Sequence, residues 1–165
     1  MRRSSVLLIL ILSMAIISPV TAETIAISVR QQSDEDEAPV LAARAEQGAM
    51  ELLFGAGHIV FDLDIEPNDD DYLSRAVESA RAGGAWYVVI LELTFETIGE
   101  RGFEPDAASV TVVEIDAPHQ MDETVIHAGE LERDDEMSAV TIADRLGAQA
   151  AAFALDSIGG GESEW

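Results

Sequence analysis

The first half of the chain alternates between two hydrophobic patterns. Residues 24–29 alternate apolar and polar side chains, which predicts a strand. A helix is predicted over 39–54, where Pro39 suits a first helical position and Gly55 and Gly57 follow the end. Residues 58–65 alternate again and predict a second strand. The apolar stripe of the predicted helix consists of Leu41, Ala45, Ala49 and Leu52.

The next segment predicts a helix and the most apolar strand of the chain. Asn68 is a suitable N-cap, and the helix ends at Gly83 and Gly84. Residues 85–96 form the strand, and its continuous apolar start places Trp86 and Tyr87 in the core. The stripe of the helix consists of Leu73, Ala76, Val77 and Ala80.

Glycine and proline in residues 97–108 predict a loop. Strands follow near 109–116 and 124–132, and Ser138 opens a third helix that reaches about Leu155. The order is therefore β-α-β-α-β-β-β-α, with the first three strands parallel because helices connect them. This predicts an α/β domain, bordering on α+β because of its hairpins, with one mixed sheet packed against helices.

The first residues have the composition of a secretory signal. Arg2 and Arg3 precede an apolar run of 12 residues, Val6 to Ile17, which is too short to span a bilayer, and small residues end at Ala22. Cleavage after Ala22 gives an exported chain, periplasmic or extracellular and soluble, that begins at Glu23. We expect a signal peptide over 1–22, one domain over 23–158 and a flexible tail over 159–165.

Acidic residues dominate the composition. The chain has 32 Asp and Glu against 9 basic residues, all arginine, and no cysteine. Loss of Arg2 and Arg3 with the signal takes the formal charge from −23 to −25. Such a charge repels phosphate backbones, so we expect no nucleic-acid partner. Without cysteine there is neither a disulfide nor an N-terminal lipid attachment site, so no membrane anchor remains after cleavage. The acidity fits either a saline environment or solubility alone.

Several short hydrophobic segments carry a resemblance to a known family. A strand at Ile25–Val29 leads to a helix that ends Leu-Leu-Phe-Gly, and the next helix ends Ala-Arg-Ala-Gly-Gly-Ala-Trp-Tyr-Val-Val. With the strand at Val112–Asp116 and an Ala-rich last helix, residues 24–158 resemble small periplasmic domains typified by the amino-terminal domain of TolB. Curli-secretion and penicillin-binding-protein-activator lipoproteins share that layout. Those families usually have a turn such as Gly-Ala-Asp before the third strand, where this chain has Gly84-Ala85-Trp86. The chain also lacks a lipidation cysteine, a propeller and a pore segment. The resemblance implies a non-catalytic, partner-binding role and no specific site residue.

One acidic segment resembles the start of a calcium loop. Asp62 begins an alternation of acids, but Pro67 and Leu73 stand where an EF-hand needs Gly and Glu. The template therefore fails, and a strand that runs into an N-capped helix accounts for the pattern. A looser cation site remains open at the same corner, and a weakly bound divalent cation is the one cofactor that the sequence leaves open. Its candidate ligands are Asp64, Glu66, Asp69 and Asp70.

No catalytic motif accompanies these residues. His58, His119 and His127 lack the spacing of a zinc site, and no Gly-x-Ser-x-Gly turn occurs. In residues 97–108, Arg101 and Phe103 offer a charged and an aromatic anchor, so we expect them to bind a partner; an ordinary hairpin loop is the alternative. The leading hypothesis is a non-catalytic extracytoplasmic binding or assembly-accessory protein with a protein partner and an undefined oligomeric state. A cation-binding acidic protein is the second hypothesis, and a hydrolase without a recognisable signature is the third.

Overall fold

The computed structural model describes residues 22–33, 35–66, 71–98, 102–118, 120–131 and 137–160. Five strands and three α-helices follow the order expected from the sequence. The strands are β1 (Thr24–Gln31), β2 (Ile59–Asp62), β3 (Tyr87–Ile98), β4 (Gly102–Glu114) and β5 (Met121–His127). The helices are α2 (Ala38–Gly55), α3 (Tyr72–Ala82) and α4 (Ala139–Gly160), with a 3-10 turn at Ala128–Glu130.

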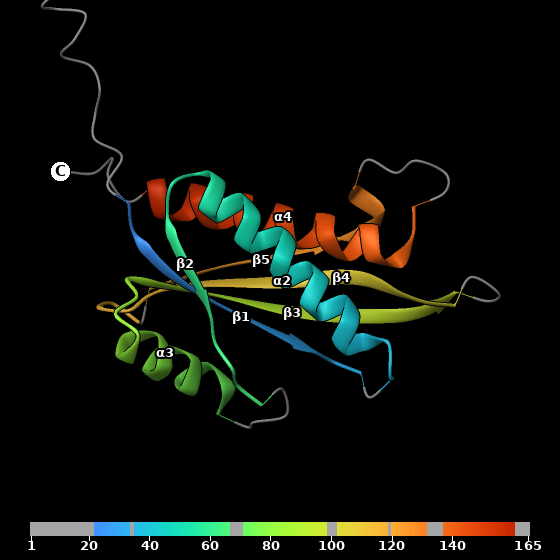
Figure 1. The fold of residues 1–165 in the computed structure, drawn as a ribbon, viewed down its shortest axis with the longest axis horizontal. Coiled ribbons are helices and arrows are strands. Elements are labelled where there is room, and N and C mark those ends of the chain that lie inside the picture. The colour runs from blue at the N-terminus through green and yellow to red at the C-terminus, as the bar shows by residue number, and fades with distance from the viewer. Residues whose placement is uncertain are drawn as a thin grey trace, which may run out of the picture.

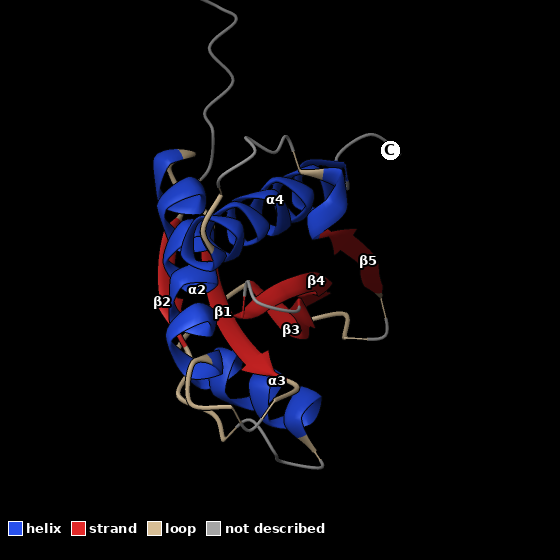
Figure 2. Ribbon diagram, turned by 90° about the vertical axis from the view of Figure 1, so that its right-hand side faces the viewer, coloured by secondary structure: helices blue, strands red, loops and turns tan. Residues whose placement is uncertain are grey.

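The strands form one mixed sheet in the order β2-β1-β3-β4-β5. As predicted, β1 is parallel to both β2 and β3, while the β3–β4 and β4–β5 pairs are antiparallel. Helices α2 and α4 cover one face of the sheet and α3 lies against the other (Figure 1, Figure 2). The domain therefore has three layers, but a single helix of 11 residues forms the third.

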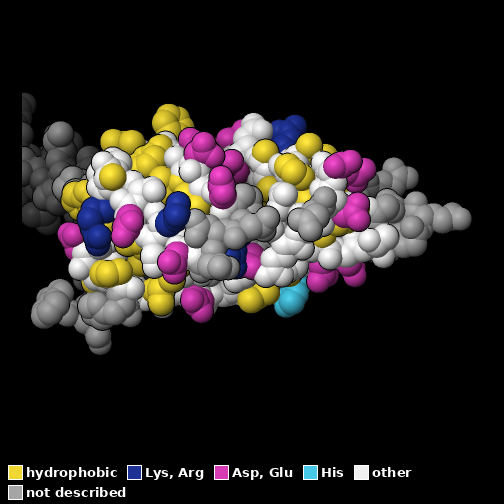
Figure 3. Space-filling model, turned by 90° about the horizontal axis from the view of Figure 1, so that it is seen from below, with side chains coloured by type: hydrophobic (Ala, Val, Ile, Leu, Met, Phe, Trp, Pro, Cys, Tyr) yellow, Lys and Arg dark blue, Asp and Glu magenta, His cyan; other side chains and the backbone are white. Residues whose placement is uncertain are grey.

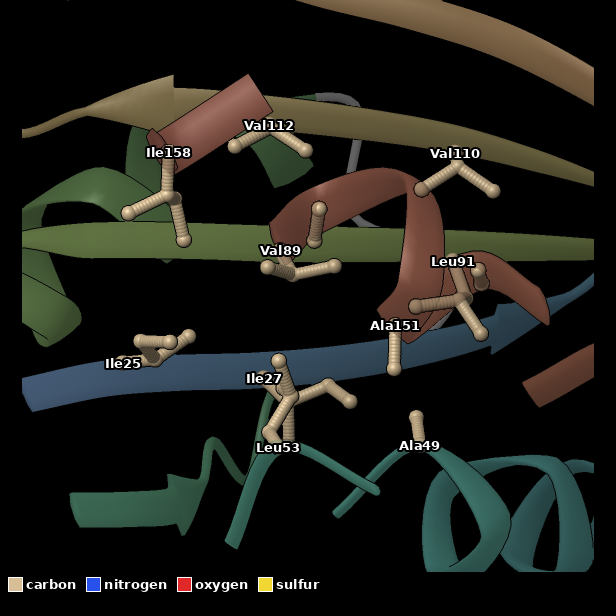
Figure 4. Close-up of a cluster of buried hydrophobic side chains, with 12 residues drawn as sticks. Ile25, Ile27, Ala49, Leu53, Val89, Leu91, Val110, Val112, Ala151 and Ile158 are labelled. Carbon is tan, nitrogen blue, oxygen red and sulfur yellow. The ribbon is translucent and has the colours of Figure 1, made fainter. Parts of the chain in front are cut away.

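The largest part of the core lies between the sheet and the α2–α4 layer. Ile25 and Ile27 of β1 point toward Leu53 of α2, and Val89 and Leu91 of β3 lie beside them (Figure 4). Each of these side chains is fully buried. Full burial of such an aliphatic side chain is worth about 1.5–3 kcal/mol, so this cluster fixes which face of the sheet the two helices cover.

The ends of the elements follow local backbone chemistry. Ser138 caps α4, where its Oγ accepts a hydrogen bond from the Thr141 amide at 3.3 Å. Gly57 and Gly84 adopt positive φ angles of 98° and 78° in the turns after α2 and α3, which confirms the helix ends expected there. Helix α4 continues to Gly160 instead of ending near Leu155, so the first two residues of the expected tail are helical.

Two apolar side chains lie on the opposite side from the one expected. Leu73 is 42% exposed, because the neighbouring Tyr72 takes the buried position at the start of α3. Trp86 precedes β3 and is 59% exposed instead of lying in the core. Both residues lie where an element begins, and there the hydrophobicity of a side chain alone does not show which side of the element is buried. Within the described residues, no helix is long and apolar enough to cross a membrane.

Candidate functional site

The expected loop at 97–108 is a β-hairpin. Strand β3 continues to Ile98 and β4 begins at Gly102, so the prediction of a long loop was wrong. Phe103 lies on β4, partly buried, and its ring stacks on Phe95 of β3 with centroids 4.6 Å apart and planes at 13°. Arg101 lies outside the described residues. The stacked ring holds the two strands together, which is a structural use for Phe103 beside the predicted partner contact.

The predicted cation corner is only partly described. Asp64 and Glu66 are exposed, and both line a hollow of about 510 Å³ after β2, together with Arg75 and Glu78. Asp69 and Asp70 lie outside the described residues. In the part of the chain that the structure describes, no three Asp, Glu or His side chains come close enough to hold a metal ion. The guanidinium of Arg75 also adds positive charge to a hollow that a cation would need to enter.

The histidines lie apart from one another. His58 is almost buried, with 9% of its side chain exposed, and its Nδ1 is 3.9 Å from Oε2 of Glu23. His127 is exposed at the end of β5, and His119 lies outside the described residues. Glu23 is the predicted first residue of the exported chain, and its carboxylate lies near His58 where the start of β1 meets the turn before β2.

A polar network crosses the face of the sheet that α3 covers. The buried Oγ of Ser28 lies 2.7 Å from the Oη of Tyr72, and the guanidinium of Arg30 lies 5.1 Å from the centre of the Tyr72 ring. Arg30 donates to Glu92 on β3 through Nε at 2.8 Å, and Gln32 also donates to Glu92. Burial raises the pKa of Tyr72, so its hydroxyl stays neutral and keeps its hydrogen bond with Ser28. These groups are partners of one another and support α3.

One carboxyl of α2 faces another at the end of β2. Burial raises the pKa of Glu46, and the charge of Asp62 raises it further. The two carboxylates carry like charges, and the charge of Glu46 also raises the pKa of Tyr72, so Glu46 is an electrostatically unfavourable carboxylate in this acidic chain.

An acidic hollow lies near the last turns of α4. Its volume is about 420 Å³, and Glu114, Asp122 and Asp156 contribute carboxylates to it beside Tyr87 and Gln120. The hollow brings together the end of β4, the start of β5 and the end of α4. Its chemistry favours cations, but these carboxylates do not form a close group of three that could hold a metal ion.

Exposed apolar side chains gather at the amino ends of the parallel strands. The Ile59 amide donates to the Glu23 carbonyl at 2.9 Å, and the Trp86 amide donates to the Thr24 carbonyl at 2.8 Å. In the sheet register, Ile59 is the partner of Thr24, and Trp86 lies beside Thr24 on its other side. Ile59 is 58% exposed and Trp86 59% exposed. We call these two residues the amino-edge corner.

A third exposed apolar side chain lies close to this corner in the chain. Phe54 is 73% exposed in the last turn of α2, and its carbonyl accepts the Gly57 amide in the turn that leads to Ile59. The sequence carried a signal for this corner: Trp86 stands two residues after Gly84, so it lies where the chain enters the sheet rather than inside the strand. Sequence reasoning missed the corner because it took the apolar run as a single buried unit.

Comparison with solved structures identifies the fold. A point variant of PelC from Paraburkholderia phytofirmans, solved as a dodecamer, aligns with a TM-score of 0.52 and 13% identity over 78% of this chain and 85% of PelC. The chain has a PelC-like fold. Lipoprotein GNA1162 from Neisseria meningitidis aligns with a TM-score of 0.44, 15% identity and 86% and 99% coverage of the two chains. The C-terminal domain of LpoB from Salmonella enterica gives a TM-score of 0.37, 13% identity and 72% and 93% coverage.

Neither a protein-family model nor a curated protein sequence matches the chain. The PelC-like fold agrees with the small mixed α/β domain expected from the sequence, and at 13% identity it concerns the fold alone. Any function must therefore be argued from the surface of this chain.

Proposed function

We propose that the chain is a non-catalytic accessory domain that is exported and binds a protein partner outside the cytoplasm. The observation that carries the proposal is the amino-edge corner, where Ile59 and Trp86 flank Thr24 and expose more than half of their surface. Single exposed apolar residues are ordinary, but two large ones on neighbouring strands, separated only by Thr24, offer two apolar anchors to one partner. Tryptophan is also among the residues most enriched at the energetic centres of protein interfaces.

The charge of the chain defines the complementary partner. An exported form with a formal charge of −25 attracts proteins with a basic surface and raises their rate of association at low ionic strength. The apolar corner would then hold the complex after the encounter. The partner that fits is therefore a protein with an apolar pocket surrounded by Arg or Lys side chains.

The likeness to PelC supports a role in protein contact. PelC, whose fold this chain shares, was solved as a dodecamer, so a fold of this kind provides surfaces for stable protein–protein contact. The signal-like residues 1–22 support export, which would place the contact in the periplasm or outside the cell.

Site-specific photocrosslinking in the producing cells tests the proposal. A benzophenone amino acid at position 86 should give a crosslinked protein adduct of defined mass, and the same residue at position 140 should not. Val140 is 39% exposed near the start of α4, far along the chain from the corner. An adduct that is equally abundant at both positions, or absent at position 86, contradicts the proposal.

A second proposed partner contact consists of Arg101 and Phe103, which the sequence predicted as partner-binding residues. The Phe103 ring is partly buried against Phe95, so only part of it can reach a partner. The change Arg101→Ala in the crosslinking experiment should weaken the adduct at position 86 only if both surfaces meet the same partner. Divalent-cation binding at Asp64 and Glu66, with Asp69 and Asp70, stays an alternative proposal.

A further inference from the structure

Strand β5 is the outer strand of the sheet on the side opposite β2. It pairs with β4 from Ala107↔His127 to Val113↔Met121, and within the described residues no other strand pairs with it. An edge strand of seven residues presents a row of backbone donors and acceptors to another strand. It is a different surface from the amino-edge corner, which includes the start of β2.

The register assigns each side chain of β5 to a face of the sheet. Thr124 is the partner of Val110 and Asp122 the partner of Val112, both of which pack in the core under α4. Glu123 and Val125 therefore lie on the other face, with Met121 and His127. Met121 is 42% exposed and Val125 is 52% exposed, so apolar surface remains open on this edge. Figure 3 shows the molecule from below, with hydrophobic side chains among the acidic ones.

We infer that β5 pairs with β5 of a second copy of this chain, antiparallel and with the two-fold axis through Thr124. In this register Thr124 meets Thr124, Glu123 meets Val125, Asp122 meets Ile126 and Met121 meets His127. Both acidic side chains of β5 thus lie opposite an apolar one. The pairing therefore opposes no two carboxylates directly, although the chain has a formal charge of −23.

Other pairings of the same strand are less favourable. A parallel pairing in register opposes Asp122 to Asp122 and Glu123 to Glu123. An antiparallel pairing centred on Glu123 opposes that carboxylate to its own copy, and like charges directly opposite each other destabilise a sheet. An antiparallel pairing centred on Val125 avoids this, but it runs into the 3-10 turn after His127 and loses the first two pairs of β5. Among the antiparallel registers, only the one through Thr124 uses all seven residues.

The symmetry of this pairing agrees with the layers of the domain. A two-fold axis perpendicular to the sheet keeps the same face of β5 upward in both copies, since opposed residues point to one side. The two α4 helices then cover the same face of a doubled sheet, and the apolar side chains of β5 lie together on the other face. Repulsion between two acidic copies opposes the pairing, so the dimer should strengthen as added salt screens their charges.

Cysteine trapping tests the register directly, because the native chain has no cysteine. Under mild oxidation, Thr124→Cys should form a disulfide-linked dimer, since residues at the two-fold axis of an antiparallel pair have Cβ atoms about 4.5–5.5 Å apart. Val125→Cys is the control: it lies on the same strand and is more exposed, but its copy is two residues away along the pair. Equal trapping of both variants, or preferential trapping of Val125→Cys, overturns the proposed register.

Charge substitutions test the same pairing without a crosslink. Val125→Glu places carboxylates opposite both copies of Glu123, while Val125→Arg places guanidinium groups there. By analytical ultracentrifugation in moderate salt, the first should weaken the dimer and the second strengthen it, each by about two- to thirtyfold in dissociation constant over two pairs. The double variant Glu123→Arg with Val125→Glu should restore the dimer. The inference is overturned if the wild-type chain stays monomeric in high salt, or if the double variant dimerises no more tightly than Val125→Glu. Circular dichroism confirms that each variant is folded.

Discussion

Gly147 of α4 lies directly against the backbone of Ala45 in α2. A Cβ atom placed on Gly147 would be 1.8 Å from the Ala45 carbonyl oxygen, and one on Gly48 of α2 would be 2.3 Å from the Asp144 carbonyl oxygen. The two helices therefore cross with a glycine from each at the point of contact. No side chain separates their backbones there, which lets both helices reach the same face of the sheet.

Gly147→Ala should lower the stability of the domain by about 1–3 kcal/mol or more, because the added methyl group overlaps backbone atoms that cannot rotate away. Gly159→Ala is the matched control, since it lies in the same helix with no atom within 4 Å of the added Cβ. Thermal or urea unfolding compares the two. Equal stability of the two variants would show that the helices separate easily.

Phe103→Ala should lower stability by about 1–2 kcal/mol, because it removes a partly buried ring that stacks on Phe95. Phe54→Ala, at a position 73% exposed, should change the melting temperature little and serves as the control. An unchanged melting temperature for Phe103→Ala would return this ring to the role of a free partner anchor.

Glu46→Gln should stabilise the domain at neutral pH, by up to about 0.5 kcal/mol for a partly exposed group. Burial and the charge of Asp62 raise the pKa of Glu46 in the folded state, so its charged form costs free energy above that pKa. The wild-type chain regains this free energy as the pH falls and Glu46 takes up a proton. The gain of the variant should therefore shrink toward pH 4 in melts followed by circular dichroism. A gain that is independent of pH would assign it to packing.

Sodium chloride should raise the melting temperature of the exported form, because ions screen the repulsion within a chain of formal charge −25. Melts over a series of salt concentrations measure the effect. Calcium chloride at matched ionic strength separates screening from binding at a specific site. A larger rise in melting temperature with calcium than with sodium would support the cation corner at Asp64 and Glu66. A melting temperature that responds to neither salt would contradict the proposed repulsion.

Mass spectrometry of the protein from its producing cell should give a chain that begins at Glu23. The prediction follows from the apolar run of 12 residues and the small residues that end at Ala22. A mature protein that retains Met1 would contradict both cleavage and the charge derived from it.

The order of elements could be predicted from sequence because each has a clear hydrophobic period and a recognisable stop. The hairpin could not, since Gly102 and Pro105 usually interrupt strands. Both lie in the part of β4 before Ala107, where β5 does not pair with β4. Pro105 has no backbone N–H to donate, but no hydrogen bond to β5 is lost there, because β5 does not extend that far. A pattern along one chain does not show where the neighbouring strand ends.

The amino-edge corner depends on the same kind of information. Whether Trp86 is buried is decided by the position of Thr24 and Ile59, which lie 62 and 27 residues before it in the sequence. The hydrophobic pattern singled out Trp86 but predicted that its side chain lies in the core, whereas it is exposed. The predicted sites at Arg101, Asp69 and Asp70 lie outside the described residues, so their roles stay predictions.

The packing of α2 on α4 also determines when the domain can fold. Helix α2 forms near the start of the chain, but the surface it needs is supplied by Ala139–Gly160, and β1 lies between two strands that are both made after it. Contacts over such sequence separations slow folding, because a long loop must close before any of them forms. The amino-terminal half has no complete core of its own while synthesis continues. We therefore expect the growing chain to complete its core only after its last helix is made, which is compatible with the proposed export in an unfolded state.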